Sequence, residues 1–368
     1  MIKILTVLGA RPQVIKSAAI TRIVRSGFAH QLQEVVLNTG QHYDVNMNAV
    51  FFEELFLPAP KYDESIDFKH PFPINQMISG IEKAIQIESP DIILVYGDTN
   101  STLAGAISAV KNDIPLVHIE AGLRSFNIDM PEEGNRILTD HSSRLLFSPT
   151  FEGVRNLQKE SIDSSRVFHC GDIMYDNSLY YHEKAKIKST ILKDNGLIQD
   201  DFILLTCHRP SNTDSKQNLT QIFQALKILA EKSNKKIVFP VHPRTKKQIL
   251  TLLGESFLKQ ELRDFLLLPP VSFLDTIMLI SNADIIITDS GGIQKEAYFF
   301  NKKSLILREE TEWVEILDEK AALLVGAEKE RIIDGYSKIK SLQPSFKPIF
   351  GDGMAGLFIC KTIVNEFT

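Results

Sequence analysis

Short apolar segments alternate along the chain with longer stretches in which apolar residues recur at helical spacing. The short segments, such as Ile92–Tyr96 and Ile237–Val241, are rich in β-branched residues. Continuous runs of this kind are typical of strands buried on both faces of a parallel sheet. We expect strands at Ile4–Leu8, Glu34–Leu37, Ile92–Tyr96, Leu116–Ile119, Leu145–Phe147, Val167–His169, Phe202–Leu205, Ile237–Val241, Phe265–Leu268, Asp284–Ile287, Leu305–Leu307 and Leu323–Val325.

The stretches between these strands predict helices, and strands that alternate with helices indicate an α/β fold. The strands fall into two series that meet near Gly171–Asn177, and 368 residues suffice for two domains of ordinary size. We therefore expect two doubly wound, Rossmann-like domains with parallel sheets, residues 1–170 and 171–353. The expected helices include Val14–Arg25, Ile74–Ile87, Ser101–Lys111, Leu219–Lys232, Phe273–Ser281 and Glu328–Ile339.

Composition argues against several classes of protein. A net charge of −5 without a basic stripe disfavours non-specific binding of nucleic acid. No apolar stretch approaches the ~20 residues that span a bilayer, and Met1–Val7 reads as a strand rather than a signal peptide. Three widely spaced cysteines, Cys170, Cys207 and Cys360, predict neither a disulfide framework nor a zinc site. We expect a cytoplasmic protein that binds neither nucleic acid nor membrane.

Polar side chains follow several of the predicted strands, at the edge where ligands of open α/β sheets bind. In the first domain these are Arg11, Asp98 and Glu120, and in the second domain His208 and His242. This distribution predicts a binding site in a cleft between the domains. The alternative for His242 is a side chain that ends its strand in solvent.

Ser290-Gly291-Gly292 follows the β-branched run Ile285–Ile287 and precedes a stretch at helical spacing. This pattern predicts a strand, a tight loop and a helix N-terminus. Glycines allow the backbone to approach a ligand, and the free amides of a helix N-terminus attract phosphate. Glu296, one turn into the helix, is placed to bind a ribose diol. The alternative is a glycine-rich turn without a ligand.

Arg11 and Lys16 bracket the start of the first expected helix, with Pro12 at its first position. Both are candidates for binding phosphate or carboxylate, and the alternative is a pair of solvated helix charges. The loop contains neither a G-x-G-x-x-G fingerprint nor a P-loop lysine, which argues against NAD and ATP as ligands.

Three acids are expected at the ligand-binding edge of the first sheet and are candidates for acid–base chemistry: Asp98, Glu120 and Glu132. Neighbouring carboxylates in a partly desolvated site can divide the roles of general acid and general base. The alternatives are a helix cap before Thr99 for Asp98 and a first-turn helix acid for Glu132. Glu120 directly follows a strand and has no such structural role.

His208 is a candidate for binding a diphosphate or donating a proton. The neighbouring Cys207 is expected to be a buried, inert thiol rather than a nucleophile. A metal site built from Asp98, Glu120 and His208 lacks any known short ligand spacing, so we expect no metal and no cofactor.

The segments that carry this chemistry are Gly9–Lys16, Thr39–His42, Gly97–Thr99, His118–Arg124, Pro131–Arg136, His208–Arg209 and Asp289–Glu296. In this order they resemble the non-hydrolysing UDP-N-acetylglucosamine 2-epimerases over essentially the whole chain. The resemblance implies the two-domain architecture of GT-B glycosyltransferases, with a last helix (354–368) that packs back on the first domain. It also implies a homodimer.

The resemblance further implies inversion of C2 in a UDP-activated 2-acetamido sugar. A base removes the C2 proton as UDP leaves C1, which gives a 2-acetamidoglycal, and UDP adds back after protonation of the other face. The catalytic residues would be Asp98, Glu120, Glu132 and His208. Substrate and UDP would be bound by Arg11, Lys16, Arg136, His242, Ser290, Gly291, Gly292 and Glu296.

Several positions depart from the usual family pattern. Gln13, Pro210 and Lys295 stand where Glu, Arg and Glu are common, and nothing in the sequence explains Lys295. Some bacterial members bind an activating UDP-N-acetylglucosamine through the Gln-His segment and the second arginine of a His-Arg-Arg motif. Pro210, together with Asp44 after Gln41-His42, therefore argues against this allosteric site.

With Tyr298 and Glu312–Glu315, these departures favour the branch that acts on UDP-2,3-diacetamido-2,3-dideoxy-glucuronate in O-antigen synthesis, slightly over UDP-N-acetylglucosamine. A GT-B glycosyltransferase is an alternative, although three acids in the first domain, rather than one base, disfavour it. A hydrolysing epimerase and a non-catalytic nucleotide-sugar-binding protein are further alternatives.

Overall fold

The computed structural model describes residues 1–41, 52–63 and 73–368. Within them the chain divides into two compact units. Unit 1 comprises Met1–Asn177 and Pro348–Thr368, and unit 2 comprises Ser178–Lys347. These boundaries lie a few residues from the expected ones, and helix α7 (Ile173–Lys188) runs across the first of them. Among the described helices, none is both long and apolar enough to cross a membrane.

Unit 1 is built on a seven-stranded sheet in the order β3-β2-β1-β4-β5-β6-β7, and its neighbouring strands are parallel. The strands are β1 (Ile2–Leu8), β2 (Leu32–Asn38), β3 (Tyr62–Asp63), β4 (Ile92–Tyr96), β5 (Leu116–Ile119), β6 (Leu145–Ser148) and β7 (Val167–His169). Helices alternate with them: α1 (Arg11–Ile23), η1 (Val24–Phe28), α3 (Pro73–Glu88), α4 (Asn100–Lys111), α5 (Pro131–Ser142), α6 (Phe151–Lys159), η2 (Ser164–Arg166) and, from the C-terminal segment, α17 (Ala355–Phe367).

Unit 2 repeats the plan with a six-stranded parallel sheet in the order β10-β9-β8-β11-β12-β13. Its strands are β8 (Phe202–Thr206), β9 (Lys236–Pro240), β10 (Leu266–Leu268), β11 (Ile285–Thr288), β12 (Lys303–Ile306) and β13 (Ala322–Leu324). Its helices are α8 (Ile191–Asp194), α9 (Pro210–Thr213), α10 (Lys216–Ser233), α11 (Pro243–Leu253), α12 (Glu255–Gln260), α13 (Phe273–Asn282), α14 (Gly291–Phe299), α15 (Val314–Asp318) and α16 (Lys329–Ser341).

The continuous apolar runs arise because both faces of the sheet are buried. In β8, Ile203 and Leu205 belong to the cluster that packs against α10 and α16, whereas Phe202 and Leu204 belong to the cluster on the other face, against α13. Successive strand residues point to opposite faces, so apolar residues are favoured at consecutive positions such as 202–205. The predicted α/β class with two doubly wound parallel sheets is confirmed.

In each sheet the strand order reverses between two neighbouring strands, β1 and β4 in unit 1 and β8 and β11 in unit 2. Ligands of doubly wound folds bind beyond the carboxyl ends of the strands at such reversals. Arg11 and Asp98 follow β1 and β4, and His208 and Ser290 follow β8 and β11. The topology therefore brings candidate residues to the position in each sheet where ligands bind.

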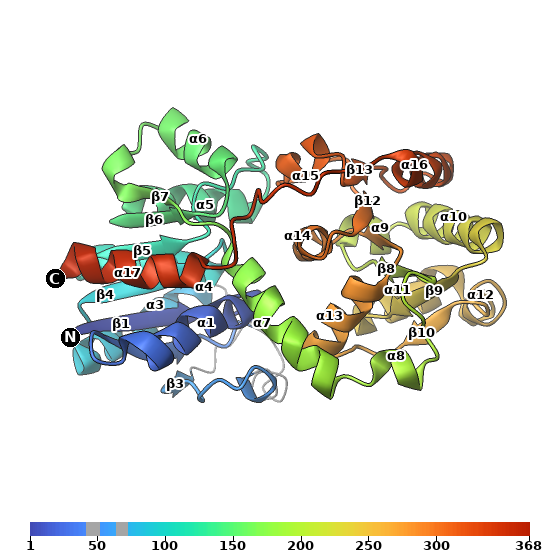
Figure 1. Ribbon diagram of the computed structural model, residues 1–368. Coiled ribbons are helices and arrows are strands. Elements are labelled where there is room, and N and C mark those ends of the chain that lie inside the picture. Colours follow the sequence, from blue (N-terminus) through green and yellow to red (C-terminus); the bar gives the residue numbers. More distant parts are fainter. Residues whose placement is uncertain (42–51, 64–72) are drawn as a thin grey trace. The chain divides into compact units, whose positions relative to one another are not determined.

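The C-terminal segment belongs to unit 1, where α17 (red) lies beside α1 (blue) in Figure 1. Gly356 permits the contact, because a Cβ there would lie 2.6 Å from the Ile23 side chain of α1. Asp176 of α7 accepts hydrogen bonds from the backbone amides of Ala355 (3.1 Å) and Gly356 (2.8 Å) at the start of α17. Burial raises the pKa of Asp176 to about 6, although the two amides act in the opposite direction.

Candidate functional site

Lys16 and Glu120 form an ion pair in unit 1, with side chains only 11% and 10% exposed. Lys16 lies in α1 and Glu120 directly follows β5. Gly97, after β4, has a φ of +63°, and a Cβ there would lie 3.1 Å from the Glu120 carboxylate and 3.2 Å from the Lys16 ammonium. Glycine at position 97 therefore makes room for the pair. The structure brings these two predicted site residues together.

The backbone of Glu120 is itself unusual, with a φ of 75°. This left-handed conformation is uncommon for a residue other than glycine, and residues held in it cost of order 1–3 kcal/mol. The amides of Glu120 and Ala121 both donate to the carbonyl of Phe147, each at 3.0 Å, and thereby hold the turn. Strain of this kind concentrates at functional sites, which supports a functional role for Glu120.

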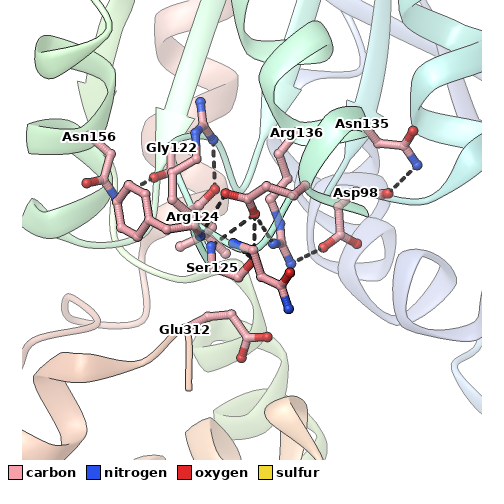
Figure 2. A network of polar contacts seen from close by, with 12 residues as sticks. Asp98, Gly122, Arg124, Ser125, Asn135, Arg136, Asn156 and Glu312 are labelled. Carbon is pink, nitrogen blue, oxygen red and sulfur yellow. Dashed lines mark hydrogen bonds and ion pairs between the residues drawn. The ribbon is translucent and has the colours of Figure 1, made fainter. Parts of the chain in front are cut away.

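Arg136 of α5 joins two acids, Asp98 and Glu133, and Figure 2 labels Arg136 together with Asp98. Its Nη2 donates to Asp98 Oδ2 at 2.5 Å, and its Nη1 donates to Glu133 Oε2 at 2.8 Å. Asn135 donates to the backbone carbonyl of Asp98 at 2.9 Å, so α5 holds both the side chain and the main chain of Asp98. Burial alone lowers the pKa of Arg136, but the Asp98 charge and the Glu133 hydrogen bond outweigh it and raise that pKa.

The adjacent acids Glu132 and Glu133 have opposite environments. Glu132 is exposed in the first turn of α5, whereas Glu133 is 2% exposed. Glu133 accepts from the amides of Ser125 (2.9 Å) and Phe126 (3.0 Å) and from Arg136. Burial raises the pKa of Glu133, yet these donors outweigh burial and lower it. The structure thus joins Glu133, and not the predicted Glu132, to the Asp98–Arg136 pair.

Gln13, one of the departures noted in the sequence, uses both polar atoms of its side chain. Its Oε1 accepts from the amides of Gly9 (2.9 Å) and Ala10 (3.0 Å), and its Nε2 donates to the carbonyl of Tyr96 (2.8 Å) and to Thr102 Oγ1 (2.9 Å). The side chain is 1% exposed. Gln13 therefore ties the loop Gly9–Ala10, directly before Arg11, to the end of β4. An ionised glutamate lacks the protons for the last two bonds.

In unit 2, Asp289 organises the loop that follows β8. Its fully buried carboxylate accepts from the amides of His208 (3.0 Å) and Arg209 (3.0 Å) and from Asn212 Nδ2 (3.1 Å). The His208 ring is 45% exposed, with Nδ1 3.5 Å from Asp289 Oδ1. Cys207 is buried, and burial followed by the Asp289 charge raises its pKa far above its usual range, in agreement with the predicted inert thiol.

Ser290 caps α14, because its Oγ accepts from the amide of Ile293 at 3.5 Å. A Cβ added at Gly291 would meet side-chain atoms only at 3.7–3.9 Å, and one at Gly292 would meet only Ser290 Oγ at 3.9 Å. These are ordinary contacts, so packing within the protein does not require glycine at either position. The two glycines leave the first amides of α14 open to a ligand.

Of the other predicted residues in unit 2, His242 lies at the start of a helix and Glu296 lies within a helix. His242 caps α11, with its Nδ1 accepting from the amide of Arg244 at 3.2 Å, and its ring centre lies 6.4 Å from that of His208. Glu296 is buried in α14. The sequence did not indicate a buried ion pair next to Gly291. In this pair Arg308 donates two hydrogen bonds to Glu312, at 2.9 and 3.0 Å.

The structure describes only some of the residues on which the argument against an allosteric site depends. His42 and Asp44 lie outside the described residues. Gln41 accepts from the amide (3.1 Å) and the hydroxyl (2.6 Å) of Ser101 at the start of α4. Pro210 occupies the first position of α9, where its fixed φ favours the helix start. In the part of the chain that the structure describes, no three His, Cys, Asp or Glu side chains gather as a metal site.

Known proteins match the chain over nearly its full length. The family model described as UDP-N-acetylglucosamine 2-epimerase matches residues 28–364. The chain is 43% identical to a UDP-N-acetylglucosamine 2-epimerase homolog of Methanococcus maripaludis, over 99% of both chains. It is 41% identical to the UDP-2,3-diacetamido-2,3-dideoxy-D-glucuronate 2-epimerase of Pseudomonas aeruginosa, again over 99% of both.

Solved structures of UDP-GlcNAc 2-epimerases are also similar to this chain. The UDP-GlcNAc 2-epimerase of Methanocaldococcus jannaschii, crystallised with UDP-GlcNAc and UDP, superposes with a TM-score of 0.89 at 37% identity, over 99% of this chain and 100% of that one. The UDP-GlcNAc 2-epimerase from Neisseria meningitidis bound to UDP-GlcNAc has a TM-score of 0.87 at 31% identity, with the same coverage. With its two parallel sheets and a match across both, the chain belongs to the UDP-N-acetylglucosamine 2-epimerase family.

Proposed function

We propose that the protein is a non-hydrolysing UDP-sugar 2-epimerase that inverts C2 of a UDP-2-acetamido sugar. The observation that carries this proposal is the pairing of acids with cations beyond the strands of unit 1, Glu120 with Lys16 and Asp98 with Arg136. Each carboxylate sits at or next to the end of a strand, where a substrate binds in such folds. Acids positioned in this way suit proton removal and proton return at one carbon.

Unit 2 would bind UDP. The amides at the start of α14, left open by Gly291 and Gly292, suit a diphosphate, and Glu296 in the same helix suits the ribose. His208, anchored through its own amide to Asp289, would interact with the diphosphate when the bond to C1 breaks. UDP would leave as the C2 proton is removed, giving a 2-acetamidoglycal, and would add back after protonation of the opposite face.

Between the two substrates considered, we favour the UDP-2,3-diacetamido-2,3-dideoxy-glucuronate type over UDP-N-acetylglucosamine. The support is the relative from Pseudomonas aeruginosa at 41% identity, together with the departures Gln13, Pro210 and Lys295. The product would still be linked to UDP and so activated for a sugar-transfer reaction. We propose that it supplies a surface polysaccharide, and that the enzyme acts in the cytoplasm as a homodimer.

One experiment tests the reaction. The protein is incubated in deuterated water with each of the two UDP-sugars, and C1 and C2 are followed by NMR. We expect the manno epimer of one UDP-sugar, still linked to UDP and carrying deuterium at C2. Free sugar plus UDP would instead establish a hydrolysing epimerase, and an absence of reaction unless a sugar acceptor is added would favour a glycosyltransferase.

Single substitutions test which acids take part in proton transfer at C2. Asp98→Asn and Glu120→Gln should abolish deuterium exchange at C2 while UDP binding persists, and unimpaired exchange in both would overturn the acid–base assignment. Glu132→Gln and Glu133→Gln form a matched pair of neighbours. Loss of exchange in the exposed Glu132 variant at unchanged stability would assign it chemistry, whereas Glu133→Gln should lower stability because four donors face its carboxylate.

A further inference from the structure

His118 in β5 is fully buried, and both of its ring nitrogens face oxygen atoms. Nδ1 lies 2.7 Å from Asp140 Oδ1, and Nε2 lies 2.8 Å from the backbone carbonyl oxygen of Gly97. The sequence drew attention to the motif that contains His118, but the proposed reaction uses only its neighbour Glu120. The two short contacts raise the question of how many protons the ring carries.

A carbonyl oxygen only accepts hydrogen bonds, so Nε2 must carry a proton. The second oxygen of Asp140 accepts from the amide of Gly122 (3.1 Å) and from Arg124 Nη1 (2.8 Å). A guanidinium and an amide that both donate to one carboxylate oxygen favour the ionised form of the acid. Asp140 is therefore an ionised acceptor, so Nδ1 must carry a proton as well.

A buried charge is tolerated only when it is paired. The charged groups around His118 alternate in sign: Asp140 from α5, Arg124 from the loop after β5, and Glu160 at the end of α6. Arg124 donates to Glu160 through Nε (2.6 Å) and Nη2 (2.8 Å), and His141 Nε2 lies 3.1 Å from the same carboxylate. The charges of His118 and Arg124 thus balance those of Asp140 and of the partly exposed Glu160, which permits an imidazolium at position 118.

The partner of this imidazolium on the other side is the peptide that leads into Asp98. Gly97 has a φ of +63°, in a region where glycine alone moves freely, so its own backbone does not hold the orientation of its carbonyl. A charged donor makes a hydrogen bond about twice as strong as a neutral one. A fixed Gly97 carbonyl fixes the main chain beside Asp98. It also keeps free the space at Gly97 beside which the Lys16–Glu120 pair lies.

We propose that His118 is a constitutively protonated positioning residue, which fixes the Gly97 carbonyl and thereby the acids on either side of it. The protonation state follows from the two ring contacts and from the donors that face Asp140. The effect on turnover rests on the proposed epimerase function.

The first test needs no substitution. In protein labelled with ¹⁵N at histidine, long-range ¹H–¹⁵N correlations at pH 8 should show one ring with protons on both nitrogens, and this signal should vanish in His118→Gln and His118→Asn. A free histidine, with a pKa of about 6.5, is neutral at this pH. A ring of His118 with only one protonated nitrogen would overturn the proposal.

The two variants form a matched pair for the positioning role. The amide nitrogen of glutamine corresponds to Nε2 of histidine and keeps the bond to Gly97, whereas that of asparagine corresponds to Nδ1 and keeps the bond to Asp140. We expect C2 exchange at saturating UDP-sugar to be about tenfold slower or more in His118→Asn than in His118→Gln, the scale of one hydrogen bond, with similar KM and thermal midpoints.

Equal rates in the two variants, or rates that follow the thermal midpoints, would overturn the positioning role. If the wild-type protein exchanges deuterium into neither UDP-sugar, the proposed function fails. In that case the NMR measurement still decides the protonation state of His118. If both variants fail to fold, the wild-type spectrum remains the test, and the absence at pH 8 of any ring with two protonated nitrogens would overturn the proposal.

Discussion

The ammonium group of Lys295 lies over the indole ring of Trp313, with Nζ 4.2 Å from the ring centre. Lys295 is 3% exposed and Trp313 is 5% exposed, so water does not screen the contact. A desolvated cation over an indole face is stabilised by about 2 kcal/mol. The contact gives Lys295, which nothing in the sequence explained, a structural role, because a carboxylate at this position would meet the negative face of the ring.

Replacing Lys295 with methionine should therefore lower the stability of unit 2 by about 0.5–2 kcal/mol, because the side chain keeps its length but loses its charge. Lys295→Arg keeps the cation and serves as the control. Trp313 is the only tryptophan of the chain, so its fluorescence during urea denaturation follows this unit directly. A methionine variant as stable as the wild type would show that the contact contributes nothing.

Gly291→Ala should leave the fold intact and weaken UDP binding. The added methyl group meets only ordinary contacts within the protein, but it projects beside the amides that we assign to the diphosphate. We expect the Kd for UDP to rise about tenfold or more, equivalent to 1.4 kcal/mol, in a titration followed by Trp313 fluorescence. Gly27→Ala, where a Cβ meets nothing within 4 Å, is the control. Unchanged affinity would remove Gly291 from the site.

Asp289→Asn should destabilise unit 2 by about 1–3 kcal/mol, because its new NH₂ group would face donors where the carboxylate now accepts. The same change should slow C2 exchange, since the loop bearing His208 loses its anchor. Asp284→Asn is a suitable control, because this acid only pairs with Lys235 and Lys340 near the surface. Differential scanning calorimetry and the deuterium assay measure the two effects. An Asp289 variant that behaves like the control would contradict the assigned role.

Asp176 predicts a pH dependence of unit 1. Its folded pKa of about 6 exceeds its ordinary value of 3.8, so the folded state binds this proton more tightly. Its contribution to stability is complete below pH 3.8 and is lost as the pH rises through 6. The stability difference between wild type and Asp176→Asn should therefore fall by up to about 3 kcal/mol between these limits, at 1.36 kcal/mol per pH unit. Thermal midpoints in a pH series measure it, and a difference that grows with pH would be contrary to this account.

The strands were predictable because each is a continuous apolar run, and the runs are continuous because both sheet faces are buried. The expected Ile92–Tyr96 and Leu116–Ile119 coincide with β4 and β5, and the expected Phe202–Leu205 falls one residue short of β8. The two-residue strand β3 has no such run and was missed. The polar residues directly after the strands were predictable for the same reason, because the end of each apolar run marks the end of its strand.

Hydrogen-bond partners far apart in the sequence were not predictable. Nothing in the pair Glu132-Glu133 indicates which side chain turns inward, because both positions lie in the first turn of one helix and the choice depends on Ser125 and Phe126. Gln13 was noted in the sequence only as a departure from a pattern, whereas in the structure its amide group bonds to four partners. Such roles depend on loops that only the folded chain brings together.

The return of Pro348–Thr368 to unit 1 makes unit 2 an insertion within it, and this has a consequence for synthesis on the ribosome. All residues of unit 2 are available before Pro348 is made, whereas α1 lacks its neighbour α17 until translation nears Thr368. Domains generally fold as units during synthesis, in the order in which their residues emerge. In this chain the unit that is translated second is the first to be complete, and the unit that carries Asp98 and Glu120 matures last.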